Sequence, residues 1–173
     1  MNLTDLRNGS RVLLDSNILL YAAARHSREC AALIERIANG EVEACLTTVT
    51  VGEVCHRWML EECRDRGIVR GGNPAKALAE KRHVISQLSN YYSLTMAVLH
   101  GRFDLRSVEP YDFVLALQLQ QRWGLLTHDS LQLAVAERMG ITAIATADNN
   151  FDAVPGITVY KPTDIKPAIL RQD

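Results

Sequence analysis

The stretch GLLTHDSLQLAVAERMGITAIATADNNFDAVP, at residues 124–155, determines the fold that we predict from the sequence. Its first half has the apolar spacing of a helix, and Asp129 or Ser130 can cap the start of that helix. Residues 141–146 then form a short apolar run with the composition of a buried strand. A polar turn that carries Asp148 follows directly. One acid therefore lies at the start of a helix, and a second lies just beyond the next strand.

The rest of the chain repeats this alternation of strand and helix. Further strands are predicted at residues 11–15, 42–48, 105–109 and 157–160. Further helices are predicted at residues 18–24, 27–38, 50–66, 75–100 and 110–123, with a turn at 70–74. Because helical segments separate the strands, the sequence predicts an α/β fold in which a parallel β-sheet has helices on both faces, an α/β/α sandwich.

The length of 173 residues fits one domain with a core of its own. We expect an N-terminal extension at residues 1–10, a single domain at 11–162 with a long helical insertion at about 74–101, and a C-terminal tail at 163–173. The chain is 47% hydrophobic and 23% charged, which is ordinary for a soluble globular protein. Its net charge of −1 means that any nucleic-acid site must be a local patch.

The expected location is the cytoplasm, without membrane association. No apolar run reaches the roughly 18–20 residues of a membrane span, and the polar first ten residues are unlike a secretory signal. The four cysteines form no CxxC pair and lie inside patterned segments, which favours buried free thiols in a reducing compartment.

Four acids are predicted to meet at one edge of the sheet. Asp15 ends the first strand, and Glu53 lies in the first turn of the helix after the second strand. In a parallel sheet the functional edge lies outside the carboxyl ends of the strands, where Asp148 and the helix start at Asp129 also fall. Asp15 is the least ordinary of these acids, because a charge at the end of an apolar strand needs a partner.

Such a cluster indicates a divalent metal ion. Two unit charges about 4 Å apart repel by roughly 4 kcal/mol at an effective dielectric near 20, so four carboxylates need protons or a cation. Hard oxygen ligands suit Mg²⁺ or Mn²⁺, and these ions promote phosphodiester hydrolysis by activating water and neutralising phosphate charge. Other hydrolase patterns are absent from the sequence, including a GxxxxGK[ST] loop and the second acid of a DxD phosphatase loop.

Four segments, read together and in this order, resemble the PIN-domain family, and most of all its VapC-like ribonuclease toxins. They are VLLDSN at 12–17, TVGEV at 50–54, GLLTHDSLQLA at 124–134 and ATADNNF at 145–151. The resemblance extends over residues 11–160. It implies Mg²⁺- or Mn²⁺-dependent cleavage of RNA, often in a homodimer, and for the toxin branch a small antitoxin protein that blocks the site.

The resemblance also implies roles for individual residues. By position it assigns the catalytic, metal-binding acids to Asp15, Glu53, Asp129 and Asp148. Asn17 and Thr146 match polar positions that support the site. Many members carry another acid two residues after the Asp148 position, where this chain has Asn150, which we count with the supporting residues.

Each acid also has a plain structural alternative. Glu53 can close a capping box with Thr50, Asp129 can be only a helix cap, and Asp148 can be only a turn residue. His128, next to Asp129, can contact substrate or transfer a proton, but we favour a loop residue without a special role. Three functions stay open: a toxin-type endoribonuclease, an RNA-processing or DNA nuclease that is not a toxin, and a catalytically inactive PIN-like interaction module.

Overall fold

The computed structural model describes residues 1–69 and 73–165. Within them, one parallel sheet has the strand order β3-β2-β1-β4-β5. Its strands are β1 (Arg11–Leu14), β2 (Glu43–Thr47), β3 (Phe103–Arg106), β4 (Ala143–Ala145) and β5 (Thr158–Tyr160). The predicted α/β fold with a parallel sheet is confirmed, although β3 begins two residues before the predicted strand at 105–109.

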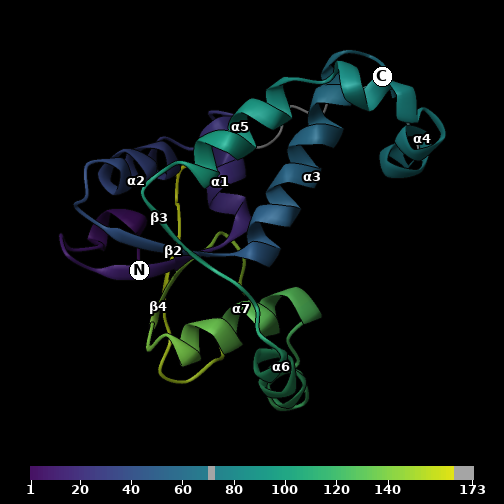
Figure 1. Cartoon of the computed structure of the whole chain (residues 1–173). Coiled ribbons are helices and arrows are strands. Elements are labelled where there is room, and N and C mark those ends of the chain that lie inside the picture. Colours follow the sequence, from purple (N-terminus) through teal and green to yellow (C-terminus); the bar gives the residue numbers. More distant parts are fainter. Residues whose placement is uncertain (70–72, 166–173) are drawn as a thin grey trace.

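Helices cover both faces of this sheet, as Figure 1 shows. One face is covered by α1 (Ser16–Ala23), α2 (Arg28–Ala38), α3 (Thr48–Asp65) and α5 (Asn90–Leu99). The other face is covered by α6 (Pro110–Trp123) and α7 (Thr127–Arg138). A short 3-10 helix, η1 (Leu3–Asp5), precedes β1. Two cores result, one on each side of the sheet.

Strand β1 contributes to both cores because successive side chains in a strand point to opposite faces. Val12 and Leu14 pack on the side of α1 and α2, whereas Leu13 packs on the side of α6 and α7. All three side chains are fully buried. This is why the strand is an unbroken apolar run, and why a charged residue directly after it is unusual.

The strand order fixes the place at which ligands bind in such sheets. From β1 the chain proceeds outward through β2 to β3, whereas β4 lies on the other side of β1 and is followed by β5. The carboxyl ends of β1 and β4 therefore form the topological switch point, outside which open α/β sheets hold their ligands. Leu14 pairs with Ala145 in the register of these two strands, and the Asp15 amide donates to the Ala145 carbonyl at 3.0 Å.

The prediction of one long helix at residues 75–100 is wrong. The segment consists of α4 (Pro74–Glu80), a 3-10 helix η2 (Arg82–Gln87) and α5. The buried carboxylate of Glu62 in α3 accepts hydrogen bonds from the amides of Ser89 and Tyr91, both at 3.0 Å, and so provides a new helix start. The short pieces turn so that Leu78, Val84 and Leu88 pack with Cys63 in a separate small core.

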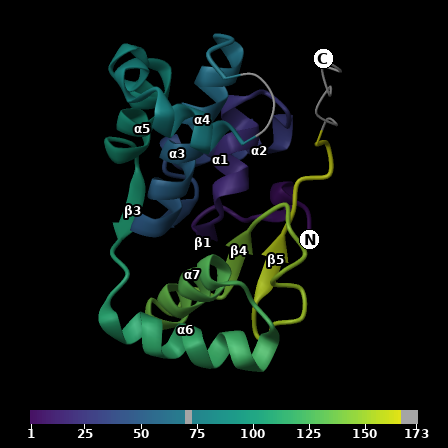
Figure 2. The ribbon, with the colours of Figure 1, turned by 90° about the vertical axis from the view of Figure 1, so that its right-hand side faces the viewer.

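This small core lies away from the sheet, where the end of α3 and α4 project in Figures 1 and 2. The predicted start of the segment is confirmed, because the Asn73 side chain accepts from the Lys76 amide at 3.1 Å and Pro74 is the first helical residue. Residues 70–72 of the predicted turn and residues 166–173 of the predicted tail lie outside the described part of the chain.

Residues at both ends of the described chain pack on the domain. Leu3 and Leu6, within the expected N-terminal extension, are buried in the same core as β1. Asp164 accepts the Ser27 hydroxyl hydrogen bond and the Arg28 amide, the latter at 2.7 Å, at the start of α2. Ser27 itself caps α2 as predicted.

Two further findings concern the chain as a whole. No helix among residues 1–69 and 73–165 has both the length and the apolar character needed to cross a membrane. All four cysteines are free thiols, and Cys30, Cys45 and Cys63 are buried. Burial raises the pKa of the Cys30 and Cys45 thiols to about 11, so these side chains are protonated core residues.

Candidate active site

Asp15 is a nearly buried carboxylate at the carboxyl end of β1, with 4% of the residue exposed. Its Oδ1 accepts from the Ser16 amide at 2.7 Å and from Gln132 Nε2 at 3.1 Å. Its Oδ2 accepts from Asn17 Nδ2 and from Thr146 Oγ1, both at 2.7 Å. Among the described residues, no lysine or arginine forms an ion pair with it. Its negative charge is held by neutral donors alone.

Asn17 and Thr146 bring Asp148 to the same place. Asn17 Nδ2 also approaches Asp148 Oδ2 at 3.2 Å, and its Oδ1 accepts from the Ala147 amide at 3.0 Å. Thr146 Oγ1 accepts from the Asp148 amide at 3.0 Å while its own hydrogen bonds Asp15. The two residues thus connect the turn after β1 with the turn after β4, which fixes one acid relative to the other.

Asp129 approaches this pair from α7. The prediction that it caps the helix is wrong, since α7 begins at Thr127 and Asp129 lies within its first turn. Burial raises the pKa of the Asp129 carboxyl, and the negative charges of Asp15 and Asp148 raise it further. A hydrogen bond from Asn150 Nδ2 to Asp129 Oδ2, at 2.8 Å, opposes that rise in part. The three aspartates therefore interact electrostatically.

Glu53 belongs to the same edge but stands apart from the aspartates. Thr47, not Thr50, caps α3, and it accepts from the Thr50 amide at 3.0 Å. The capping-box alternative for Glu53 is therefore wrong, as is its placement in the first turn, because Glu53 lies one turn further along. Its side chain is one-third exposed, and its Oε2 lies 3.4 Å from His128 Nε2. Figure 1 shows α3 and α7 both beginning at this edge.

Gln132 is the residue of this site that sequence reasoning missed. It is fully buried on α7, and its Nε2 contacts both Asp15 Oδ1, at 3.1 Å, and His128 Nδ1, at 3.0 Å. Its Oε1 is buried and has no hydrogen-bond partner in the described part of the chain. The sequence signal that could have identified Gln132 is a polar amide within the otherwise apolar run LQLAVA. All six residues of this run, 131–136, are buried in the structure. His128, which had been assigned no special role, connects Gln132 to Glu53.

The spacing of the acidic side chains bears on whether they can hold a metal ion. In the described part of the chain, no three acid, histidine or cysteine side chains are close enough together to hold a metal as they stand. The raised pKa of Asp129, caused first by burial and then by the charge of Asp15, is consistent with carboxylates that are held apart. The site therefore offers oxygen donors whose negative charges repel one another.

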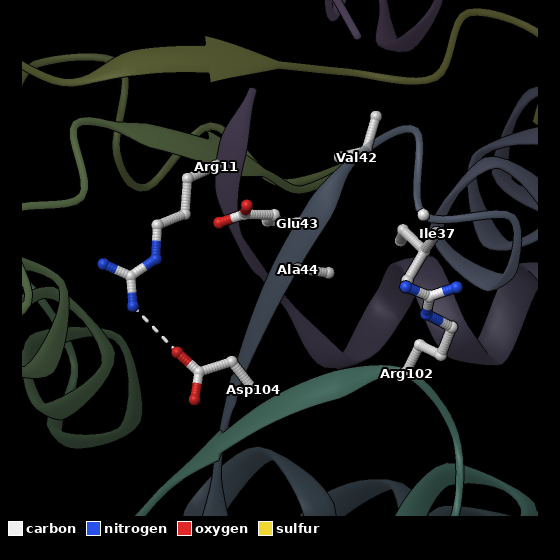
Figure 3. A pocket seen from close by; sticks show the side chains of 8 residues that line it. Arg11, Ile37, Val42, Glu43, Ala44, Arg102 and Asp104 are labelled. Carbon is white, nitrogen blue, oxygen red and sulfur yellow. Dashed lines mark hydrogen bonds and ion pairs between the residues drawn. The ribbon is translucent and has the colours of Figure 1, made fainter. Parts of the chain in front are cut away.

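A cavity of about 390 Å³ lies at the opposite edge, where the strands begin, and the four acids do not line it. Figure 3 shows its polar lining, in which Arg11 Nη2 pairs with Asp104 Oδ2 at 2.8 Å. Arg11 Nη1 also donates to the Met139 carbonyl at 3.1 Å. These contacts join β1 to β3, which lie on either side of β2, and join β1 to the end of α7, so they stabilise the sheet at a distance from the acids.

Comparison with known proteins gives a family and a fold. The family model of the PIN domain matches residues 12–157. Similar solved chains include one in VapBC2 from Rickettsia felis bound to a DNA fragment from their promoter, with 14% identity and a TM-score of 0.55 over 88% of this chain and 98% of that one. Another, in a toxin-antitoxin complex from Klebsiella pneumoniae, has 18% identity and a TM-score of 0.52 over 85% and 95%. No curated protein matches the sequence.

We expect Asp129→Asn to stabilise the metal-free protein at about pH 7. A carboxyl whose pKa is raised on folding destabilises the native state while it is ionised, and an asparagine removes that charge. The gain should disappear as the pH falls through the pKa of Asp129, where the wild type is also neutral. Urea unfolding with EDTA present, at several pH values, measures both effects.

Asp152→Asn is the matched control, because Asp152 pairs with Lys161 and lies outside the acidic site. The free energy of unfolding of Asp152→Asn should equal that of the wild type or be slightly lower, because an exposed ion pair contributes little to stability. An Asp129→Asn protein that is less stable than the wild type at neutral pH would contradict the electrostatic account of the site.

Proposed function

This chain belongs to the PIN-domain family, and on that premise we propose that it is a divalent-metal-dependent endoribonuclease of the toxin type. The observation that carries the proposal is the convergence of Asp15, Asp129 and Asp148 at the switch point of the sheet. These acids come from distant parts of the chain and, among the described residues, none has a basic partner. A fold that only needed stability would not gather them.

The donors fit Mg²⁺ or Mn²⁺. Both ions prefer carboxylate oxygens, and the three aspartates offer oxygen donors with surplus negative charge. Asp15, Asp129 and Asp148 would hold the ion, and Glu53 would bind it directly or through water. When bound, the ion supplies water activation and neutralises charge on the phosphate.

The neutral residues of the site orient its acids. Asn17 and Thr146 hold Asp15 and Asp148 through hydrogen bonds, and Asn150 holds Asp129. These donors stabilise the ionised carboxylates without adding positive charge, so the demand for a cation is preserved. We assign to them the positioning of ligands and not contact with the scissile bond.

Asp15→Asn should lower Mn²⁺-dependent cleavage of labelled RNA by more than about 100-fold, since even partners behind metal ligands contribute 10- to 100-fold. The assay compares wild type and variant on RNA and on DNA, each with Mn²⁺ or with EDTA. Asp152→Asn should cleave like the wild type. Preferential cleavage of DNA would favour the DNA-nuclease alternative. Equal activity of Asp15→Asn and wild type would contradict a metal-dependent mechanism that uses Asp15.

A toxin role is tested in growing cells. The similar chain from Klebsiella pneumoniae occurs in a toxin-antitoxin complex, and we propose a small antitoxin partner for this chain as well. Induced wild type should arrest growth, Asp15→Asn should not, and co-expression of the correct small partner should restore growth. If cells grow normally while they express a wild-type protein that is soluble and cleaves RNA, the result would instead indicate a processing nuclease.

The homodimer implied by the family resemblance also has a candidate interface. Helix α6 buries Ala116 and Leu119 against α7 but exposes Phe113, Val114 and Leu117 on its other side, each at 50–60%. A helix that is apolar on both sides favours burial on both, and adjacent exposed apolar side chains mark contact surfaces. We propose that two copies pack through this face of α6.

Leu117→Lys should therefore convert a dimer to the 19.3 kDa monomer, because two buried ammonium groups at a symmetric contact cannot be paired with each other. Light scattering with size-exclusion chromatography measures the mass. Tyr92→Lys, which replaces an exposed aromatic on α5, is the control and should keep the wild-type mass. A monomeric wild type, or a dimeric Leu117→Lys, would contradict the interface.

A further inference from the structure

The side-chain amide of Gln132 faces two different groups of the site with the same nitrogen. Asp15 can only accept hydrogen bonds when ionised, so the atom 3.1 Å from its Oδ1 must be the amide nitrogen. That nitrogen carries two hydrogens. The second is directed to His128 Nδ1 at 3.0 Å, which must accept it.

This arrangement determines where a neutral His128 carries its proton. If Nδ1 accepts, the proton lies on Nε2, and Nε2 is the atom that faces Glu53 Oε2 at 3.4 Å. The contact is longer than a hydrogen bond, and Nε2 has no hydrogen-bond partner among residues 1–69 and 73–165. The Gln132 amide therefore donates to His128 Nδ1, and the N–H group at His128 Nε2 points toward Glu53 Oε2. The same glutamine amide also donates to Asp15.

We propose that Gln132 is a positioning residue that couples Asp15 to Glu53 by holding His128 in its Nε2–H tautomer. The inference rests on the proposed function in that these two acids belong to one site. It gives a role to a residue of the segment 124–134 that is not one of the four acids, and it accounts for the position of His128 between Gln132 and Glu53.

The loss of stability caused by burying the Gln132 side-chain amide indicates that this residue does more than fill space in the core. Gln132 is fully buried and its neighbours along α7 are apolar, and none of the residues that the structure describes gives its Oε1 a hydrogen-bond partner. A buried acceptor without a partner lowers stability, and an apolar side chain of similar size would avoid that penalty. What such a side chain lacks is the pair of donors to Asp15 and His128.

Gln132→Met tests the proposal because it keeps the volume and removes both donors. We expect its melting temperature to match or exceed that of the wild type, while Mn²⁺ affinity measured by calorimetry falls about 10- to 100-fold. In the metal-free protein, ¹⁵N NMR of the labelled His128 ring should show loss of the hydrogen bond at Nδ1. Gln120→Met is the matched control, since Gln120 of α6 donates a side-chain amide hydrogen bond to Ser130 of α7 and not to one of the four acids.

Gln132→Glu gives a second, opposite readout. An ionised carboxylate at this position accepts instead of donating, so the proton of a neutral His128 should move to Nδ1 in the metal-free protein. An unchanged ring signal in Gln132→Met, or unchanged Mn²⁺ affinity beside a clearly lower melting temperature, would overturn the positioning role. Wild type that binds no Mn²⁺ would count against the proposed function, and the ring signal would then decide this inference alone.

Discussion

The structure depends on satisfying the Asp15 carboxylate with hydrogen bonds at the end of a buried strand. Burying a charge is costly unless its oxygens are hydrogen-bonded or paired. Here the Ser16 amide, Asn17, Gln132 and Thr146 supply the hydrogen bonds, and they come from the turn after β1, from α7 and from the end of β4. The one carboxylate thereby ties together the three segments that meet at the switch point. Because all of these donors are neutral, the site keeps a full negative charge.

The architecture and the proximity of Asp15 and Asp148 could be predicted from sequence because both follow from short-range rules. Alternating strands and helices require a parallel sheet, and residues placed just after strands must gather at its carboxyl edge. Asp15 and Asp148 follow neighbouring strands, so their proximity needs no tertiary detail. The supporting positions Asn17, Thr146 and Asn150 lie within two residues of those acids and are placed by the same turns.

What sequence reasoning missed depends on contacts between distant residues. The segment at 75–100 has helical spacing throughout, yet the buried Glu62 carboxylate gives Ser89 and Tyr91 amides a partner outside the segment and so starts a new helix. Gln132 sits at a helical position whose neighbours are apolar, and only the fold reveals that Asp15 lies opposite it. His128 looked like a loop residue because α7 was expected to begin after it, whereas the helix begins at Thr127.

The balance between repulsion and hydrogen bonding also gives Asn150 a physical meaning. An acid in place of Asn150 would add negative charge beside Asp129, whose pKa is already raised by burial and by Asp15. The amide of Asn150 instead donates to Asp129 Oδ2 at 2.8 Å and opposes that rise. An amide at this position therefore adds no charge to the site and partly offsets the electrostatic strain on Asp129.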